Sequence, residues 1–226
     1  MKPAQNPTDW LAPAAQARLD ELITEVTTNP ARIAVLFPAA ARAIARGPVD
    51  PADPDGLITP RVEDEVRIAL LRAAERRWRP SELTVEITAL YRHGDAEEKR
   101  AVLRALDHLE LGDVLLPLVR DALRCNDSRL IAAALGTYAM RHLDDHTWRH
   151  GVLKALFTGV PLDAVVGVAE RGDAELSRMA SAYIAERLAA GRPVPQDAER
   201  LLQLCAGNAT ARTDHRDPPA GQDEEE

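Results

Sequence analysis

Apolar residues recur along most of the chain at the spacing of one face of an α-helix. No pair of alternating apolar and polar runs is joined by an Asn-Gly turn, the strongest local signal of a β-hairpin. The pattern therefore predicts an all-α protein. Its clearest apolar stripes are Leu19, Leu22, Ile23 and Val26; Val102, Ala105, Leu106 and Leu109; and Ile131, Ala134, Leu135 and Tyr138.

Capping residues divide this pattern into segments of helix length. Thr59-Pro60 predicts a helix start, with threonine as the N-cap and proline in the first turn, and this helix should continue through Trp78. The segment after it should end at Gly94 in the left-handed conformation that favours glycine. Asp95 and Glu98 together form a capping box, which predicts the start of the next helix.

The centre and the end of the chain carry similar signals. Asn126-Asp127 predicts the start of one continuous helix over residues 128–143. Gly136 then lies inside a helix, where glycine costs about 1 kcal/mol relative to alanine, so we expect an adjacent helix to approach closely there. A last short helix is expected over residues 195–204.

Very short turns between these helices force consecutive helices to be antiparallel neighbours. From Asp95 to Val160 the helix pair recurs at roughly 30–35 residues, which favours stacked hairpins in a HEAT-like α-solenoid. We therefore predict a single repeat domain over residues 1–206 and a disordered acidic tail over 207–226. Within that domain, residues 1–60 form N-terminal helices and a Pro-, Gly- and Asp-rich loop at 47–60, and residues 61–206 form the stack.

The composition narrows the possible functions. Aromatic residues make up only 4% of the 226, so the core must be mainly aliphatic, which suits helix packing. The net charge is −8 and the pI about 5.3, the opposite of what general nucleic-acid binding requires. The one basic and aromatic cluster, RRWRP at 76–80, is too short to change that. AEEKR at 96–100 is interpreted as an ordinary solvated face.

Cysteine usage and the N-terminus indicate a cytoplasmic location. Cys125 and Cys205 are far apart and form neither a disulfide framework nor a zinc motif, which fits a reducing compartment. The first residues lack the apolar run of a signal peptide, and charges interrupt every candidate membrane span. We expect no direct membrane insertion, no nucleic-acid partner and no cofactor.

Residues 126–162, NDSRLIAAALGTYAMRHLDDHTWRHGVLKALFTGVPL, resemble the EboA family. RAVLRAL at 100–106 and GDVLLPLVRDALR at 112–124 belong to the same resemblance, which extends over about 91–188. The resemblance implies a gene cluster that includes a prenyltransferase-like membrane enzyme and a TatD-like hydrolase and is linked to making or exporting a secondary metabolite. It supplies no reaction for any residue.

Three histidines gather near one helix start. His146 and His150 are four positions apart on the helix that Asp144-Asp145 should cap, and His142 precedes the cap. Such spacing is a known metal-ligand pattern, and a metal-dependent enzyme using residues 142–150 is one hypothesis. The alternative, which we favour, is that the aspartates cap the helix and the histidines are partly exposed and hydrogen-bonded.

Other polar residues could line a groove. Lys154 interrupts the apolar run VLKALF, so it either extends from the edge of a packed face or faces an anion in a groove. Tyr138 and Trp148 could line the same groove, although core packing explains them as well. Asn126 and Arg129 at a helix start could bind an anion, or simply cap the helix and bridge to a neighbouring repeat.

No nucleophile elbow, phosphate-binding loop or dinucleotide turn is present in the sequence. Together with the stacked helix pairs and the resemblance to the EboA family, this predicts a non-catalytic binding or adaptor protein, and the resemblance implies pathway enzymes or a membrane-associated pathway protein as its partners. A second hypothesis is a carrier that holds a small hydrophobic or anionic metabolite in the helical groove.

Overall fold

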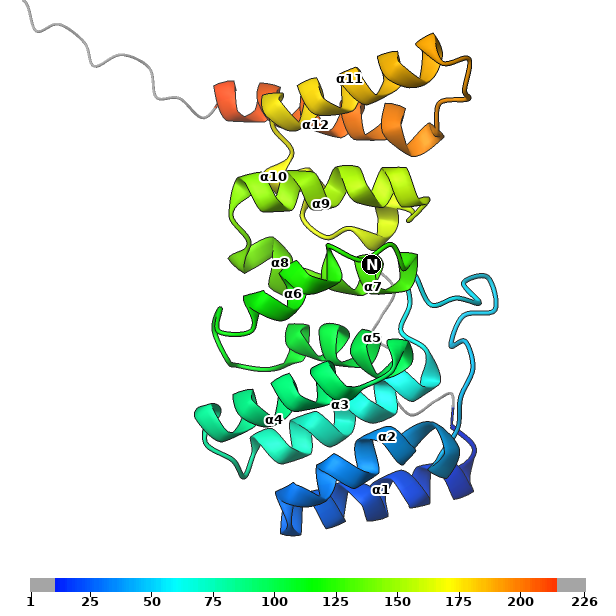
Figure 1. The fold of residues 1–226 in the computed structure, drawn as a ribbon, viewed down its shortest axis with the longest axis vertical. Coiled ribbons are helices and arrows are strands. Elements are labelled where there is room, and N and C mark those ends of the chain that lie inside the picture. The colour runs from blue at the N-terminus through cyan, green and yellow to red at the C-terminus, as the bar shows by residue number, and fades with distance from the viewer. Residues whose placement is uncertain (1–10, 215–226) are drawn as a thin grey trace, which may run out of the picture. The chain divides into compact units, whose positions relative to one another are not determined.

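The structure is a computed structural model that describes residues 11–214. The chain divides into two compact units, residues 1–166 and 167–226, which we call the N-terminal and C-terminal units. Throughout residues 11–214 the regular structure is helical, without strands, and one isolated bridge joins Pro48 and Arg61 (Figure 1). The predicted all-α class is confirmed.

The N-terminal unit holds most of the helices that the chain was expected to form. Three short 3₁₀ turns accompany them, at Pro30–Arg32, Leu106–His108 and Leu162–Ala164. The α-helices are α1 (Pro13–Thr28), α2 (Ile33–Ala43), α3 (Val62–Glu75), α4 (Pro80–His93), α5 (Ala96–Ala105), α6 (Leu116–Ala122), α7 (Ser128–Ala134), α8 (Thr137–His142) and α9 (Asp145–Thr158).

Within the N-terminal unit, alternate helices pack on one another in successive layers (Figure 1). Both α1 and α2 pack against α3, α3 packs against α5, α5 against α7, and α7 against α9. Helices α1 and α2 therefore belong to the same set of layers as the rest of the unit. The core is mostly aliphatic and includes the buried rings of Phe37, Tyr91, Tyr138 and Trp148.

The C-terminal unit contains α10 (Val168–Arg171), α11 (Ala174–Ala189) and α12 (Gln196–Asp214). Helix α12 packs against both α10 and α11. It is longer than the expected last helix and includes the first residues of the segment predicted as a tail; residues 215–226 lie outside the described part. Across residues 11–214, no helix has both the length and the apolar character needed to cross a bilayer.

The predicted continuous helix over 128–143 was wrong, because it breaks into α7 and α8 at Gly136. The Asp107 carboxylate accepts hydrogen bonds from the N–H groups of Thr137 (3.0 Å) and Tyr138 (2.6 Å) at the start of α8. A Cβ at Gly136 would lie 2.5 Å from Asp107 Oδ2. Glycine is needed there because the Asp107 side chain, from the 3₁₀ turn Leu106–His108, approaches closely, and not because of an adjacent helix.

Two further helix ends differ from expectation. Helix α3 begins after Arg61, whereas the N–H of Thr59 donates to Asp53 Oδ2 at 2.7 Å and helps to hold the preceding loop. Gly94 is extended, with φ −75°, so the left-handed prediction was wrong. A Cβ at Gly94 would lie 2.6 Å from the Leu90 carbonyl oxygen, and this crowding explains the glycine.

Candidate functional site

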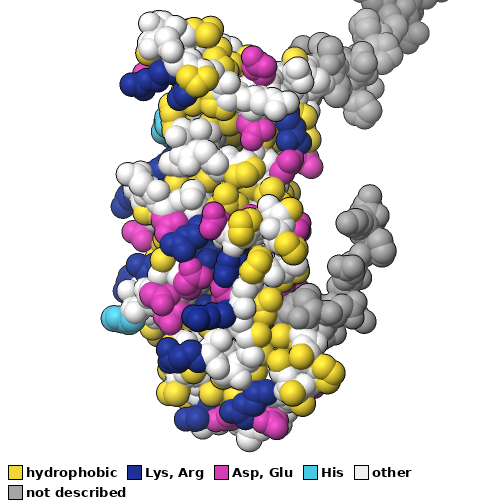
Figure 2. All heavy atoms as spheres, turned by 90° about the vertical axis from the view of Figure 1, so that its right-hand side faces the viewer, with side chains coloured by type: hydrophobic (Ala, Val, Ile, Leu, Met, Phe, Trp, Pro, Cys, Tyr) yellow, Lys and Arg dark blue, Asp and Glu magenta, His cyan; other side chains and the backbone are white. Residues whose placement is uncertain are grey.

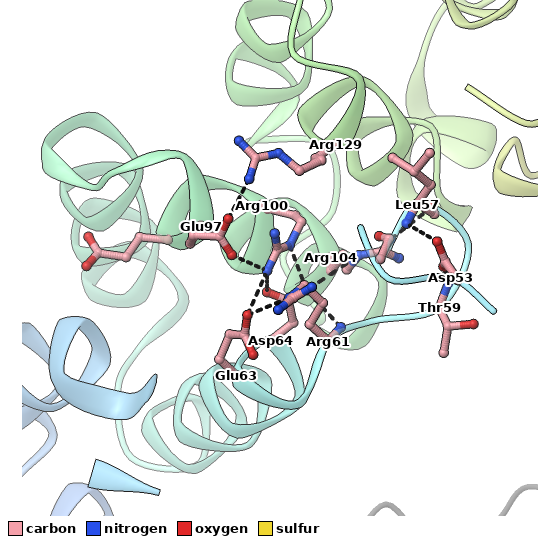
Figure 3. A network of polar contacts seen from close by, with 12 residues as sticks. Asp53, Leu57, Thr59, Arg61, Glu63, Asp64, Glu97, Arg100, Arg104 and Arg129 are labelled. Atoms are coloured by element: carbon pink, nitrogen blue, oxygen red, sulfur yellow. Dashed lines mark hydrogen bonds and ion pairs between the residues drawn. The ribbon is translucent and has the colours of Figure 1, made fainter. Parts of the chain in front are cut away.

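A buried network of ion pairs joins the starts of α3 and α5 (Figure 3). Arg100 is 1% exposed and binds Asp64 with two hydrogen bonds, Nε to Oδ2 at 2.8 Å and Nη2 to Oδ1 at 3.0 Å. Its Nη2 also lies 2.7 Å from Glu97 Oε2. Burial alone lowers the pKa of Arg100, but its hydrogen bonds and attraction to Asp64 and Glu97 outweigh burial and raise it. The interpretation of 96–100 as a solvated face was therefore wrong for Arg100.

The same network fastens the loop at 47–60 (Figure 3). Arg104 Nη2 donates to the carbonyl oxygens of Gly56 (2.5 Å) and Leu57 (3.0 Å). The Asp53 carboxylate accepts from three consecutive backbone N–H groups, from Leu57 to Thr59. Burial raises the pKa of Asp53, yet these hydrogen bonds together lower it. A loop rich in proline and glycine is thus held in one conformation by charged groups.

Beside this network lies a cleft of about 650 Å³ between α2, the start of α3 and the start of α5. We call it the arginine cleft. On the face in Figure 2, basic and acidic side chains gather at the height of α2, α3 and α5. The charged residues that line the cleft are Arg42, Arg46, Arg61, Arg67, Glu63, Asp95, Glu97 and Glu98, and Pro38, Ala41 and Gly47 complete the lining.

Arg67 is the unusual member of this cleft. It is only 2% exposed, its Nε donates to the Phe37 carbonyl oxygen at 3.1 Å, and its guanidinium lies over the Phe37 ring at 5.4 Å. Its Nη1 is buried and hydrogen-bonds to no described residue, and no carboxylate of residues 11–214 pairs with it. A buried charge without a partner is costly, and native proteins pair such groups with an opposite charge, an ion or water.

The carboxylates of the cleft are already engaged. Glu63 lies one helical turn before Arg67, but it accepts from Arg61 Nε at 2.7 Å and from the Gly47 N–H at 2.9 Å. Asp95 and Glu98 form the predicted capping box of α5, which is confirmed. Arg42 and Arg46 are exposed at the cleft and form no ion pair with any residue in the described part. The unused charge in the cleft is therefore positive, which suits an anion.

A second concave surface of about 400 Å³ lies between α6 and α9. We call it the lysine groove, and its lining is Arg120, Leu123, Arg124, Thr147, His150, Gly151 and Lys154. Of the predicted candidates, Lys154 and His150 therefore do face a groove. Arg120 Nη2 lies 3.4 Å from Asp144 Oδ2, while Lys154 and Arg124 form no ion pair within residues 11–214.

Tyr138 and Trp148 do not share this groove with Lys154. Tyr138 is buried, and its hydroxyl accepts a hydrogen bond from the Leu115 N–H at 3.0 Å. Burial raises the pKa of that hydroxyl. Trp148 is fully buried in α9. Both side chains lie in the core, the alternative explanation given for them from the sequence.

The three histidines are divided between two helices. The His142 ring contacts the Tyr138 ring at 4.8 Å between centroids, whereas His146 and His150 face each other at 4.2 Å. Among residues 11–214, no group of three His, Cys, Asp or Glu side chains could hold a metal ion. The geometry gives the metal hypothesis no support. Asp144 is the N-cap of α9, and hydrogen bonds from the Thr147 N–H and hydroxyl lower its pKa to about 2.

Asn126 and Arg129 lie at the start of α7, where Arg129 forms ion pairs within the fold, as in the alternative to an anion site. Asp127, and not Asn126, is the N-cap of α7, and Asn126 is exposed before it. Arg129 bridges to α5, with Nη1 2.6 Å from Glu97 Oε1 and Nη2 2.8 Å from Asp127 Oδ2. The Nη1 and Nη2 groups of Arg129 are therefore already paired with carboxylates of this chain.

Sequence reasoning missed Arg67 and Arg100, the two most buried cationic side chains of the site. Arg67 stands between Val66 and Ile68 in a helix whose apolar positions continue to Leu70 and Leu71, all of them buried. A charged residue within such a wide apolar pattern indicates a buried charge, so this local signal could have identified Arg67. Arg100 sits among charged neighbours and gives no such signal.

The fold and these clefts define an all-helical protein with concave surfaces lined by cationic side chains. The family model described as "Metabolite traffic protein EboA" matches residues 59–203, more than half of the 226. The chain therefore belongs to the EboA family, as its central block indicated, and the match extends beyond the expected 91–188 at both ends. No curated protein and no solved structure matches the chain.

Proposed function

We propose that this chain is a non-catalytic carrier that holds a small anionic metabolite in the arginine cleft. We also propose that its helices form a HEAT-like α-solenoid in the N-terminal unit, because packing between alternate helices is typical of helical repeats. The family description as a metabolite traffic protein supports a metabolite as the ligand. A cytoplasmic location, as expected from the cysteines, accords with this function.

The observation that carries the proposal is the buried guanidinium of Arg67, which has no carboxylate partner among residues 11–214. Arg67 lines the cleft, its buried Nη1 has no hydrogen-bond partner among the described residues, and the nearby carboxylates have other partners. A guanidinium fits the planar oxygens of a carboxylate or phosphate group. A volume of about 650 Å³ also lies within the ordinary range for small-molecule sites.

Isothermal titration calorimetry of the full chain tests this function. The probes are inorganic phosphate, methyl phosphate and acetate, in a low-salt buffer free of other strong anions. We expect saturable binding of at least one probe, weakened at least tenfold by Arg67→Met. Arg72→Met is the matched control, because Arg72 lies on the same helix but is exposed and outside the cleft. Absence of binding by all probes, or equal binding by Arg67→Met, would contradict the proposal.

A second candidate function is the adaptor role, and the lysine groove favours it. In a chain of net charge −8, Lys154, Arg120 and Arg124 converge on one groove between two helices. Unlike the arginine cleft, this groove contains no fully buried charge, so it suits an exposed acidic segment of a partner protein. Pathway enzymes or a membrane-associated pathway protein are the proposed partners.

Co-purification with products of the neighbouring genes, first at low and then at high salt, tests the adaptor role. We expect the chain to capture at least one purified protein encoded by these genes. This binding should be lost at high salt and in the double variant Arg124→Glu plus Lys154→Glu. Arg92→Glu, on the exposed side of α4, is the control and should bind normally. If the double variant captures the partner as well as the unchanged chain does, the groove is not the docking surface.

A further inference from the structure

A smaller cavity of about 210 Å³ adjoins the arginine cleft. It lies between α2 and α4, and we call it the α2–α4 pocket. Pro38 of α2 and Glu98 of α5 line both cavities, so the two meet at these residues. The other residues of the pocket are Ala34, Glu86, Ala89, Leu90, His93 and Gly94.

The walls of this pocket differ in chemistry from those of the arginine cleft. Ala34, Pro38, Ala89 and Leu90 supply small or apolar surfaces from two facing helices. Pro38 has no N–H, so it offers no hydrogen-bond donor on its wall. Burial raises the pKa of Glu86, which marks this environment as one that disfavours charge. The pocket therefore suits an apolar group.

The charged residues that line the two cavities determine which end of a ligand lies in each cavity. Four arginines line the larger cleft together with its carboxylates, whereas the pocket is lined by Glu86 and Glu98 without an arginine or lysine, and would repel a second anionic group. A molecule that fills both cavities must then have its anionic end at Arg67 and an uncharged end between α2 and α4.

We propose that the metabolite is an amphiphile, with a phosphate or carboxylate head in the arginine cleft and an aliphatic tail in the α2–α4 pocket. This inference rests on the proposed carrier function and names the class of ligand for the same site. It requires that affinity increase with tail length, because each methylene that leaves water contributes to binding. The expected gain is two- to fourfold for each added methylene, and fourfold corresponds to about 0.8 kcal/mol.

Two matched series of straight-chain ligands test the inference, one of alkyl phosphates from methyl to octyl and one of the corresponding carboxylates. All are used below the concentrations at which they form micelles, and calorimetry measures their affinity for the full chain. The two series distinguish the two head groups. We expect affinity to rise with length in the series whose head group binds, and then to level off once the pocket is filled.

Variants that fill the pocket locate the tail. Ala89→Phe from α4 and Ala34→Leu from α2 should each remove the gain with length but leave the affinity for the shortest ligand unchanged. The two variants alter opposite walls of the pocket, so the test still holds if one of them fails to fold. Circular dichroism would reveal such a failure. Val85→Phe is the matched control, because Val85 lies on α4, is 70% exposed and does not line the pocket.

The outcomes separate the two proposals. If the shortest ligand binds and Arg67→Met abolishes binding, but affinity does not change with tail length, the amphiphile inference is overturned and the carrier function stands. A gain with length that persists in both pocket variants overturns the location of the tail. If no ligand of either series binds, the carrier function itself is lost.

Discussion

Arg100 and Arg67 are almost equally buried, at 1% and 2% exposed, but their surroundings differ. Arg100 has Asp64 and Glu97 as partners from α3 and α5, and its charge is compensated within the fold. Arg67 has a backbone carbonyl and an aromatic ring, but no carboxylate partner in the described part of the chain. The comparison teaches that burial alone does not indicate a binding group. What indicates it is a buried charge that the protein leaves uncompensated beside an open cleft.

The strongest test of this comparison is Arg100→Met. Loss of Arg100 would leave Asp64 fully buried, with the more distant Arg104 Nε, 3.9 Å away, as its one cationic partner within residues 11–214. Breaking a buried ion pair in this way costs about 3–5 kcal/mol. Urea unfolding followed by circular dichroism should therefore give a much lower unfolding free energy. The exposed control Arg72→Met should stay within about 0.5 kcal/mol of the unchanged chain, and a similarly small loss in Arg100→Met would contradict the structural role.

Acid pH tests the carboxylate side of the network. Burial raises the pKa of Glu63, but hydrogen bonds from Arg61 and the Gly47 N–H outweigh burial and lower it below 4.5. A carboxyl with a lowered folded pKa stabilises the fold above its unfolded pKa, and this contribution disappears as the pH falls through the folded value. Unfolding free energies measured from pH 6 to pH 3 should thus fall more steeply in the unchanged chain than in Glu63→Gln. Parallel curves would show that Glu63 is not part of this effect.

Arg129→Met should have a smaller effect than either change in the buried pairs. Arg129 also bridges two helices, but its side chain is 35% exposed and those of Asp127 and Glu97 are 26% and 36% exposed. Partly exposed ion pairs of this kind contribute at most about 1 kcal/mol. Urea unfolding measures the difference, and high salt should reduce it. If Arg129→Met lowers the unfolding free energy as much as Arg100→Met does, ion pairing determines the stability more than the burial of the pair.

Arg67→Met should change the stability of the ligand-free chain least. It removes one hydrogen bond to Phe37, worth about 1 kcal/mol, but it also removes an uncompensated buried charge. We expect a net change below about 1 kcal/mol in urea unfolding, together with loss of any rise in melting temperature on addition of the bound anion. A large loss of stability without ligand would make Arg67 a structural residue.

The fold was largely predictable from the sequence because helices are specified by local signals. Asp95 with Glu98, and Asp144, cap helices as expected, since each accepts hydrogen bonds from residues three positions away. The break at Gly136 was not predictable. It depends on Asp107, which lies 30 residues before Thr137 and meets it only in the folded chain. Local periodicity carries no information about such a contact.

The candidate site was less predictable for the same reason. Lys154 was identified as a candidate because a single charge interrupts an apolar run, and this signal is local. The arginine cleft is assembled from α2, α3 and α5, which are separated in sequence by a loop and by α4. Whether Arg67 or Arg100 has a carboxylate partner is decided by which helices are neighbours, and the periodicity of one helix does not determine that.

The fastening of the loop at 47–60 has a practical consequence for anyone who shortens this protein. The family match begins at residue 59, and that residue is the natural place to cut. A chain cut there would lack Arg42 and Arg46, would expose the Phe37-binding side of Arg67, and would leave Arg104 without the two carbonyl oxygens of Gly56 and Leu57. The region that defines membership of the family therefore does not contain every residue that builds the cleft.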